Sequence, residues 1–134
     1  MFFCHPLIRV PFFARLGLIA LRFVVSAIAL GFTIVIDLSL SMAGHLEDCM
    51  IEAVITFISA LARCGIENFS VITFGETVKL IKTEHEEWDA IAKYLLLSQL
   101  RCDQYASFDA DAVEWALQLS RMSSVRGPKK IFVF

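Results

Sequence analysis

The sequence predicts an α/β fold, in which helices cover both faces of a mostly parallel sheet. Short runs of β-forming residues alternate with longer stretches of helical periodicity. The runs at 33–37 and 69–74 are almost continuously apolar, as is typical of strands buried on both faces. Because strands that alternate with helices pair mainly in parallel, we expect a Rossmann-like, doubly wound sheet.

The first half of the pattern predicts a strand, a long helix and two further strands. After the strand at 33–37, residues 47–64 show helical periodicity, and Gly65 follows as a helix-ending residue. Residues 69–74 form the second strand, and Gly75-Glu76 turns the chain into a half-exposed strand at 77–82. The expected inner face of the helix is Met50, Ile51, Val54, Ile55, Ile58, Leu61 and Ala62.

The second half predicts two helices and a fourth strand. Residues 86–100 are expected to be helical with Trp88, Ile91, Ala92 and Leu95 inward. A polar loop leads to a helix at 108–122, whose expected inner face is Ala112, Trp115, Ala116 and Leu119. Gly127-Pro128 then breaks the chain before the strand 129–134. Since the sequence stops in this strand, we expect 31–134 to be the N-terminal part of a larger domain, truncated at its fourth strand.

Residues 1–30 differ in composition from the rest of the chain. The chain has 134 residues and 14 acids, and every acid lies at or after Asp37. The basic, apolar stretch before it contains an A-x-A-like site at Ala27-Ile28-Ala29. It is interpreted as a secretory signal, a membrane anchor, a presequence or a segment outside any domain. A membrane partner is expected only if this segment is an anchor.

The charge pattern and the cysteines favour an intracellular protein that does not bind nucleic acid. Lys129-Lys130 and Arg126 are isolated and form no extended basic patch. The four cysteines contain no C-x-x-C pair. Cys49 and Cys64 are expected about 22 Å apart on one helix, too far for a disulfide. We therefore expect reduced, mostly buried thiols, and a secreted or membrane location only through residues 1–30.

The stretch "TIVIDLSLSM" places one acid and two hydroxyls at the end of the first strand. In open α/β sheets, ligands bind beyond the carboxyl ends of the strands. Alternate residues of an extended turn point the same way, so Asp37, Ser39 and Ser41 are expected to converge. Three oxygen ligands, one of them charged, suit a hard cation such as Mg²⁺. The alternative is an ordinary capped loop before a helix, because Asp and Ser are common there.

"IVIDLSLSM", a long helix and "FSVITFGETVKLIK" together resemble the von Willebrand factor A (VWA) family over about 32–134. The resemblance implies a metal-ion-dependent adhesion site built on D-x-S-x-S, with a threonine from a second loop. The matching position is Ser107, five residues before Ala112-Val113, where a serine replaces the threonine and Gln104-Tyr105-Ala106 replace the usual glycines. "FSVITFGETVKLIK" is most similar to the midasin-like A domains, which belong to larger ATPases.

The resemblance implies a docking module in which Asp37, Ser39, Ser41 and Ser107 hold Mg²⁺, or Mn²⁺ in its place. Such a module binds a protein partner through a Glu or Asp carboxylate. It is not an enzyme itself, although it can be the binding domain of an ATPase whose motor is not in this chain. Asp109 and Asp111 are expected to be structural, because acids are favoured at a helix start.

Two other functions remain open. A Mg²⁺-dependent phosphatase-like hydrolase would also begin with an acid after its first strand, but it needs a second acid two residues later, where this chain has Ser39. His45 and His85 are expected at the surface and offer no base for a serine nucleophile. A secreted or membrane-anchored adhesion protein would carry the same site behind a signal or an anchor.

Overall fold

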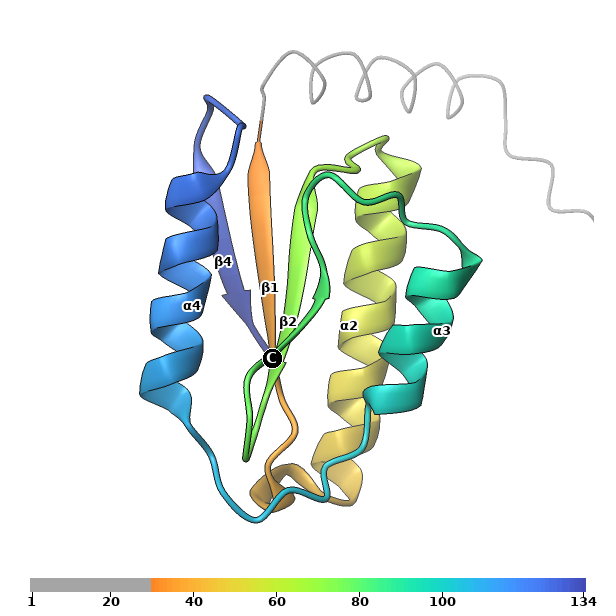
Figure 1. The fold of residues 1–134 in the computed structure, drawn as a ribbon. Coiled ribbons are helices and arrows are strands. Elements are labelled where there is room, and N and C mark those ends of the chain that lie inside the picture. The colour runs from red at the N-terminus through yellow and green to blue at the C-terminus, as the bar shows by residue number, and fades with distance from the viewer. Residues whose placement is uncertain (1–29) are drawn as a thin grey trace, which may run out of the picture.

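The structure is a computed structural model, and it describes residues 30–134. These residues form four strands, three α-helices and one 3-10 turn, which lies between the first strand and the first α-helix (Figure 1). The strands are β1 (Gly31–Asp37), β2 (Phe69–Phe74), β3 (Lys79–Lys82) and β4 (Lys129–Val133). The helices are η1 (Leu40–Met42), α2 (His45–Arg63), α3 (Ala90–Gln99) and α4 (Asp109–Met122). The interpretation of 1–29 as a signal, an anchor or a non-domain segment lies outside the described residues.

The four strands form one sheet in the order β3-β2-β1-β4. β1 pairs in parallel with both β2 and β4, and β3 runs antiparallel to β2. The predicted mixed α/β fold with a mostly parallel sheet is therefore confirmed. All four predicted strands are present, although β3 begins at Lys79 and not at Thr77.

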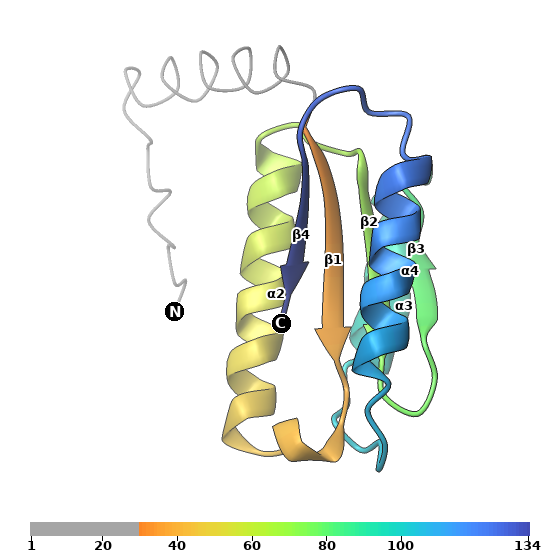
Figure 2. The same ribbon diagram turned by 90° about the vertical axis from the view of Figure 1, so that its left-hand side faces the viewer.

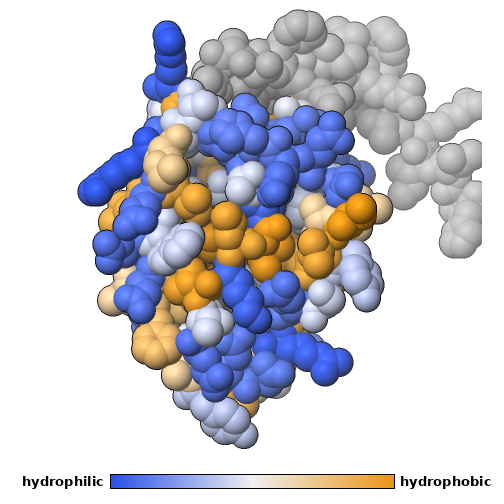
Figure 3. Space-filling view, viewed as in Figure 1, coloured by the Kyte–Doolittle hydropathy of each residue, from blue (hydrophilic) through white to orange (hydrophobic). Residues whose placement is uncertain are grey.

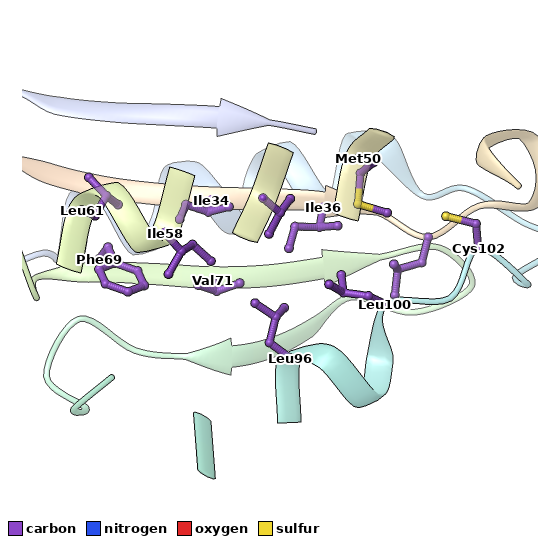
Figure 4. Close-up of a cluster of buried hydrophobic side chains, with 12 residues drawn as sticks. Ile34, Ile36, Met50, Ile58, Leu61, Phe69, Val71, Leu96, Leu100 and Cys102 are labelled. Atoms are coloured by element: carbon purple, nitrogen blue, oxygen red, sulfur yellow. The ribbon is translucent and has the colours of Figure 1, made fainter. Parts of the chain in front are cut away.

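Helices cover both faces of the sheet. α2 and α3 lie on one face and α4 on the other (Figures 1 and 2). The larger core, shown in Figure 4, joins β1 and β2 to residues of α2 and of the α3 region, including Leu96 and Leu100. The smaller core packs Val35 and Ile72 against Ala112 and Ala116 of α4. Each central strand therefore buries both of its faces, as its apolar sequence predicts.

α2 follows its prediction closely. It ends at Arg63, and Gly65 has a φ of 73°, the left-handed conformation that a helix-ending glycine provides. The amide of Ile66 donates to the carbonyl of Leu61 at 2.9 Å and so closes the last turn. The buried residues of α2 are Met50, Val54, Ile58 and Leu61. The prediction that Ile55 also faces inward is wrong, because this side chain is 41% exposed.

The inner face predicted for α3 is wrong at Ile91 and Leu95, which are exposed. The helix begins at Ala90 and not at Glu86, because Asp89 caps it by accepting from the amide of Ala92 at 2.8 Å. Leu96 is its buried residue, whereas Ile91 is 67% exposed. The helix has apolar residues on nearly all of its sides, so hydrophobic periodicity does not identify which face is buried. Trp88 precedes the helix and packs half-buried against the ring of Phe69.

α4 begins and ends where predicted to within one residue, but its packing is narrower than expected. Ala112 and Ala116 are buried, and Leu119 packs beside them. Trp115 is 45% exposed, so its predicted inward position is wrong. Small alanines bring α4 close to the sheet, and a bulky indole on the same turn is then directed outward.

The three cysteines in the described residues are free, as predicted. Cys102 is buried, Cys64 is half-buried and Cys49 is exposed. The expectation of a small buried hydrophobe therefore holds for Cys102 only. Cys4 lies outside the described residues.

A buried lysine closes the amino end of β2. Lys82, the last residue of β3, is 1% exposed. Its Nζ donates to the carbonyls of Glu67 (3.2 Å), Phe69 (2.8 Å) and Thr83 (2.8 Å) and lies 4.3 Å from the centre of the Phe69 ring. Burial lowers the pKa of Lys82, and the carboxylates of Glu86, Glu67 and Glu84 partly oppose this shift. The predicted half-exposed strand thus ends in a side chain that is fully buried and fully hydrogen-bonded.

Replacing this lysine should destabilise the fold. Lys82→Met keeps most of the apolar stem but leaves three carbonyls without their donor, so we expect a loss of about 1–3 kcal/mol in the free energy of unfolding. Chemical denaturation measures the change. Lys79→Met is the matched control, because Lys79 lies exposed on the same strand.

The same variant gives a pH test. Because the folded-state pKa of Lys82 is lowered, the unfolded chain binds this proton more tightly. The contribution of Lys82 to stability should therefore rise as pH increases from its folded-state pKa toward its ordinary value of 10.5. A gap between wild type and Lys82→Met that shrinks over this pH range would contradict the assignment.

Candidate metal-binding edge of the sheet

Asp37 is the last residue of β1 and is half-buried at the carboxyl edge of the sheet. Its amide donates to the carbonyl of Phe134 at 2.9 Å, and the amide of Leu38 donates to the carbonyl of Phe74 at 2.8 Å. The backbone here is thus held from both neighbouring strands. As a result, the position of the Asp37 carboxylate is set by the sheet and not by a free loop.

Ser39 and Ser41 lie in a compact turn directly after Asp37. The amide of Ser39 donates to Oδ1 of Asp37 at 2.8 Å, and the hydroxyl oxygens of Ser39 and Ser41 are 2.9 Å apart. Ser39 is buried and Ser41 is exposed. The chain does not continue in the extended form assumed from the sequence, because the 3-10 turn at Leu40–Met42 follows Ser39. The turn nevertheless brings both hydroxyls together on the carboxylate side of β1.

Ser107 is linked to this region through an intermediate residue. Its hydroxyl is exposed and donates a short hydrogen bond to the carboxylate of Asp109. Asp109 and Asp37 line the same hollow, which has a volume of about 270 Å³, while Ser107 is not among the residues that line it. The prediction that Asp109 belongs to the first turn of a helix is confirmed. Its carboxylate is also one of the two that face the hollow.

The loop before α4 is tied to the end of β1 by Gln104. The amide of Gln104 donates to Leu38 O at 3.3 Å, and its carbonyl accepts from the amide of Leu40 at 2.7 Å. Its side chain accepts from the amide of Glu76 at 2.7 Å, and Glu76 Oε1 in turn accepts from the amide of Tyr105 at 3.1 Å. Gln104 therefore holds the loops after β1 and β2 beside its own loop. We did not predict this role from the sequence.

A protonated thiol lies behind the carboxylate. Cys102 Sγ donates to the backbone carbonyl of Asp37 at 3.7 Å, and its amide donates to Glu47 Oε1 at 3.2 Å. Burial raises the pKa of Cys102 to about 11, and the carboxylates of Glu47, Asp37 and Asp103 act in the same direction. Near neutral pH this group is a thiol and a poor metal ligand, so the edge offers oxygen ligands only.

Neither histidine in the described residues is placed to activate a serine. His45 is exposed at the start of α2 and its closest polar neighbour is Cys49, at 3.7 Å between Nε2 and Sγ. His85 is exposed and lies 3.3 Å from a Glu84 carboxylate oxygen. Within 30–134, no hydrogen bond joins a histidine to Ser39 or Ser41. The surface positions predicted for both histidines are confirmed.

No protein-family model, curated protein or solved structure matches this chain. Among the described residues there is no group of three or more His, Cys, Asp or Glu side chains placed to hold a metal ion. Nor does any helix in 30–134 have the length and apolar character needed to cross a membrane.

The two serine hydroxyls of the β1 turn have the spacing of adjacent ligands around a small hard cation. Mg²⁺ binds six oxygens at 2.0–2.1 Å, which places adjacent ligands of the octahedron about 2.9 Å apart. The two serine hydroxyls have this separation. Because Oδ1 of Asp37 accepts from the Ser39 amide, the second carboxylate oxygen remains for an ion. The turn can therefore supply one charged and two neutral ligands.

The loop contact at Gly75 should be intolerant of a side chain. A Cβ at Gly75 would overlap the Gln104 side chain, with only 2.9 Å to the Gln104 Cβ. We expect Gly75→Ala to destabilise the fold by about 1–3 kcal/mol, measured by thermal or denaturant unfolding. Gln104→Ala removes the far end of the clashing side chain, so the double variant should lose less stability than the sum of the single variants. Strict additivity would show that this contact does not hold the loops.

Proposed function

We propose that this protein is a metal-dependent docking module of the VWA type, built on a Rossmann-like doubly wound sheet. The observation that carries the proposal is the Asp37–Ser39–Ser41 turn at the carboxyl end of β1. The strand order supports it, because the chain places β2 on one side of β1 and β4 on the other. In doubly wound sheets, ligands bind beyond the strand ends at such a switch of direction.

In this proposal Asp37 provides the charged ligand, and Ser39 and Ser41 provide neutral ones. A bound Mg²⁺, or Mn²⁺, supplies a positive charge that a single carboxylate does not neutralise. Ser107 contributes from the second loop, directly or through the Asp109 carboxylate to which it donates. The partner is a protein that offers a Glu or Asp carboxylate to the remaining position. Apolar residues such as Val35 and Phe74 line the hollow beside Asp37 and would strengthen the charge interaction.

The alternative activities are less well supported. A phosphatase-like hydrolase needs a general acid two residues after the first aspartate, and this position is Ser39, whose hydroxyl bonds to that of Ser41. A serine nucleophile needs a nearby base, and the described histidines lie elsewhere. A secreted or membrane-anchored adhesion protein would use the same edge and differ only in residues 1–30.

Removing the one charged ligand should weaken metal binding. Asp37→Asn keeps the size of the side chain but removes its charge, so we expect the affinity for Mn²⁺ to fall at least ten-fold, equal to about 1.4 kcal/mol. Mn²⁺ binding can be followed by electron paramagnetic resonance on the full chain. Asp111→Asn is the matched control, because Asp111 is an exposed acid in the first turn of α4 and does not line the hollow. Equal affinities for wild type and Asp37→Asn would contradict the proposal.

A second assay separates docking from catalysis. With Mg²⁺ present, we expect no turnover of phosphate monoesters or simple esters by the wild-type chain, because Ser39 and Ser41 bond to each other and, in the described part of the chain, to no base. Product release is measured spectrophotometrically. Turnover that disappears in Asp37→Asn would favour the hydrolase and refute the docking mechanism.

A further inference from the structure

A surface with exposed apolar side chains lies around α3. Of the ten residues of this helix, only Leu96 is buried. Ile91 and Tyr94 are 67% and 71% exposed, and Leu95 and Leu97 are also exposed. Figure 3 shows hydrophobic residues gathered in a band across this side of the molecule. A contiguous patch of exposed apolar side chains is typical of an interaction surface.

Hollows flank α3 on both sides. One, of about 340 Å³, lies against the end of α2 and includes Ile66 and Trp88. Another, of about 290 Å³, lies against β3 and includes Ile81 and Leu95. Glu87 and Asp89 border both hollows. We call α3 with these two hollows the α3 surface.

The border of the α3 surface is predominantly acidic. Glu67, Glu86, Glu87 and Asp89 line the two hollows, and Lys93 is the one basic residue among their linings. No ion pair to a Lys or Arg is present for these four acids within 30–134. The occupant that fits is therefore apolar and carries positive charges.

The chain itself contains such a segment. Residues 1–29 include Arg9, Arg15 and Arg22, have no acid, and are otherwise largely apolar. This segment joins the fold just before Gly31, at the amino end of β1. Phe32 pairs there with Phe69, which follows Ile66 and Glu67 by a few residues. The point where the segment joins the fold and the hollow that contains Trp88 therefore lie at the same edge of the sheet.

We propose that residues 1–29 dock onto the α3 surface, with arginines facing the acidic border and apolar side chains in the hollows. Tethering makes this contact intramolecular, which raises the effective concentration of the segment to the millimolar range. A segment of 29 residues can span about 100 Å when extended, so its length allows the contact. The proposal does not depend on the metal site, which occupies the opposite edge of the sheet.

The two tryptophans provide a reporter and a control. Trp88 lies in the α3 surface, whereas Trp115 is on α4, on the other face of the sheet. In full-length Trp115→Phe, fluorescence comes from Trp88 alone. Changing Arg9, Arg15 and Arg22 to Glu should at least double the acrylamide quenching constant of Trp88. The same three positions changed to Lys keep the charge and should leave the constant at its starting value.

Further measurements make the test decisive. Glu87→Lys changes an exposed border residue that makes no hydrogen bond within 30–134, so the fold should persist while Trp88 becomes more accessible. In full-length Trp88→Phe, quenching of Trp115 should not respond to any of these changes. Quenching of Trp88 that is equal in the Arg and Glu forms would overturn the proposal. Protection of Trp88 from acrylamide that increases with protein concentration would also overturn the proposal, and would indicate that a second copy of the chain binds this surface.

Discussion

The arrangement of the molecule depends on β1 being hydrogen-bonded on both edges and buried on both faces. β2 and β4 pair with it in parallel, so the ends of three strands are aligned at one edge. Ile34 and Ile36 face the core under α2, and Val35 faces the core under α4. A strand held in this way cannot slip by one residue without exchanging its two buried sets of side chains. The carboxylate that follows therefore has a fixed place at the sheet edge.

The strands were predictable because their apolar runs are short and uninterrupted, and burial on both faces tolerates only such sequences. The buried face of α3 was not predictable, because apolar residues lie on nearly every side of the helix, including the exposed Ile91, Tyr94, Leu95 and Leu97. Trp115 was misplaced for a different reason, since the neighbouring alanines bring α4 too close to the sheet for an indole. Lys82 was expected at a half-exposed position, and its burial is explained by backbone carbonyls that accept from its Nζ, two of them distant in sequence. Hydrophobic periodicity thus identified elements well and their packing less well.

At the candidate site, the sequence identified the chemical groups but not the bonds that position them. Asp37, Ser39 and Ser41 are near one another in sequence, so local geometry was enough to place them together. Gln104 is separated from Glu76 by 28 positions, and its role depends on a loop path that residue spacing does not determine. The same holds for Ser107, whose hydrogen bond is to Asp109. Contacts between loops depend on the assembled sheet, which places the ends of β1 and β2 side by side.

The turn after β1 explains why an ion bound here would need a partner. Backbone and side-chain hydrogen bonds already hold Asp37, Ser39 and Ser41 in the described structure, so binding would require little ordering of the chain. Ordering of the chain would therefore not limit ion binding. The affinity for the ion would depend on the number of negatively charged ligands. In the proposal Asp37 is the one charged ligand of the ion, and Asp109 lines the same hollow and accepts from Ser107. A divalent cation held by Asp37 alone would keep an excess of positive charge, and a carboxylate from the proposed partner would neutralise it in a partly apolar surrounding where that attraction is strong.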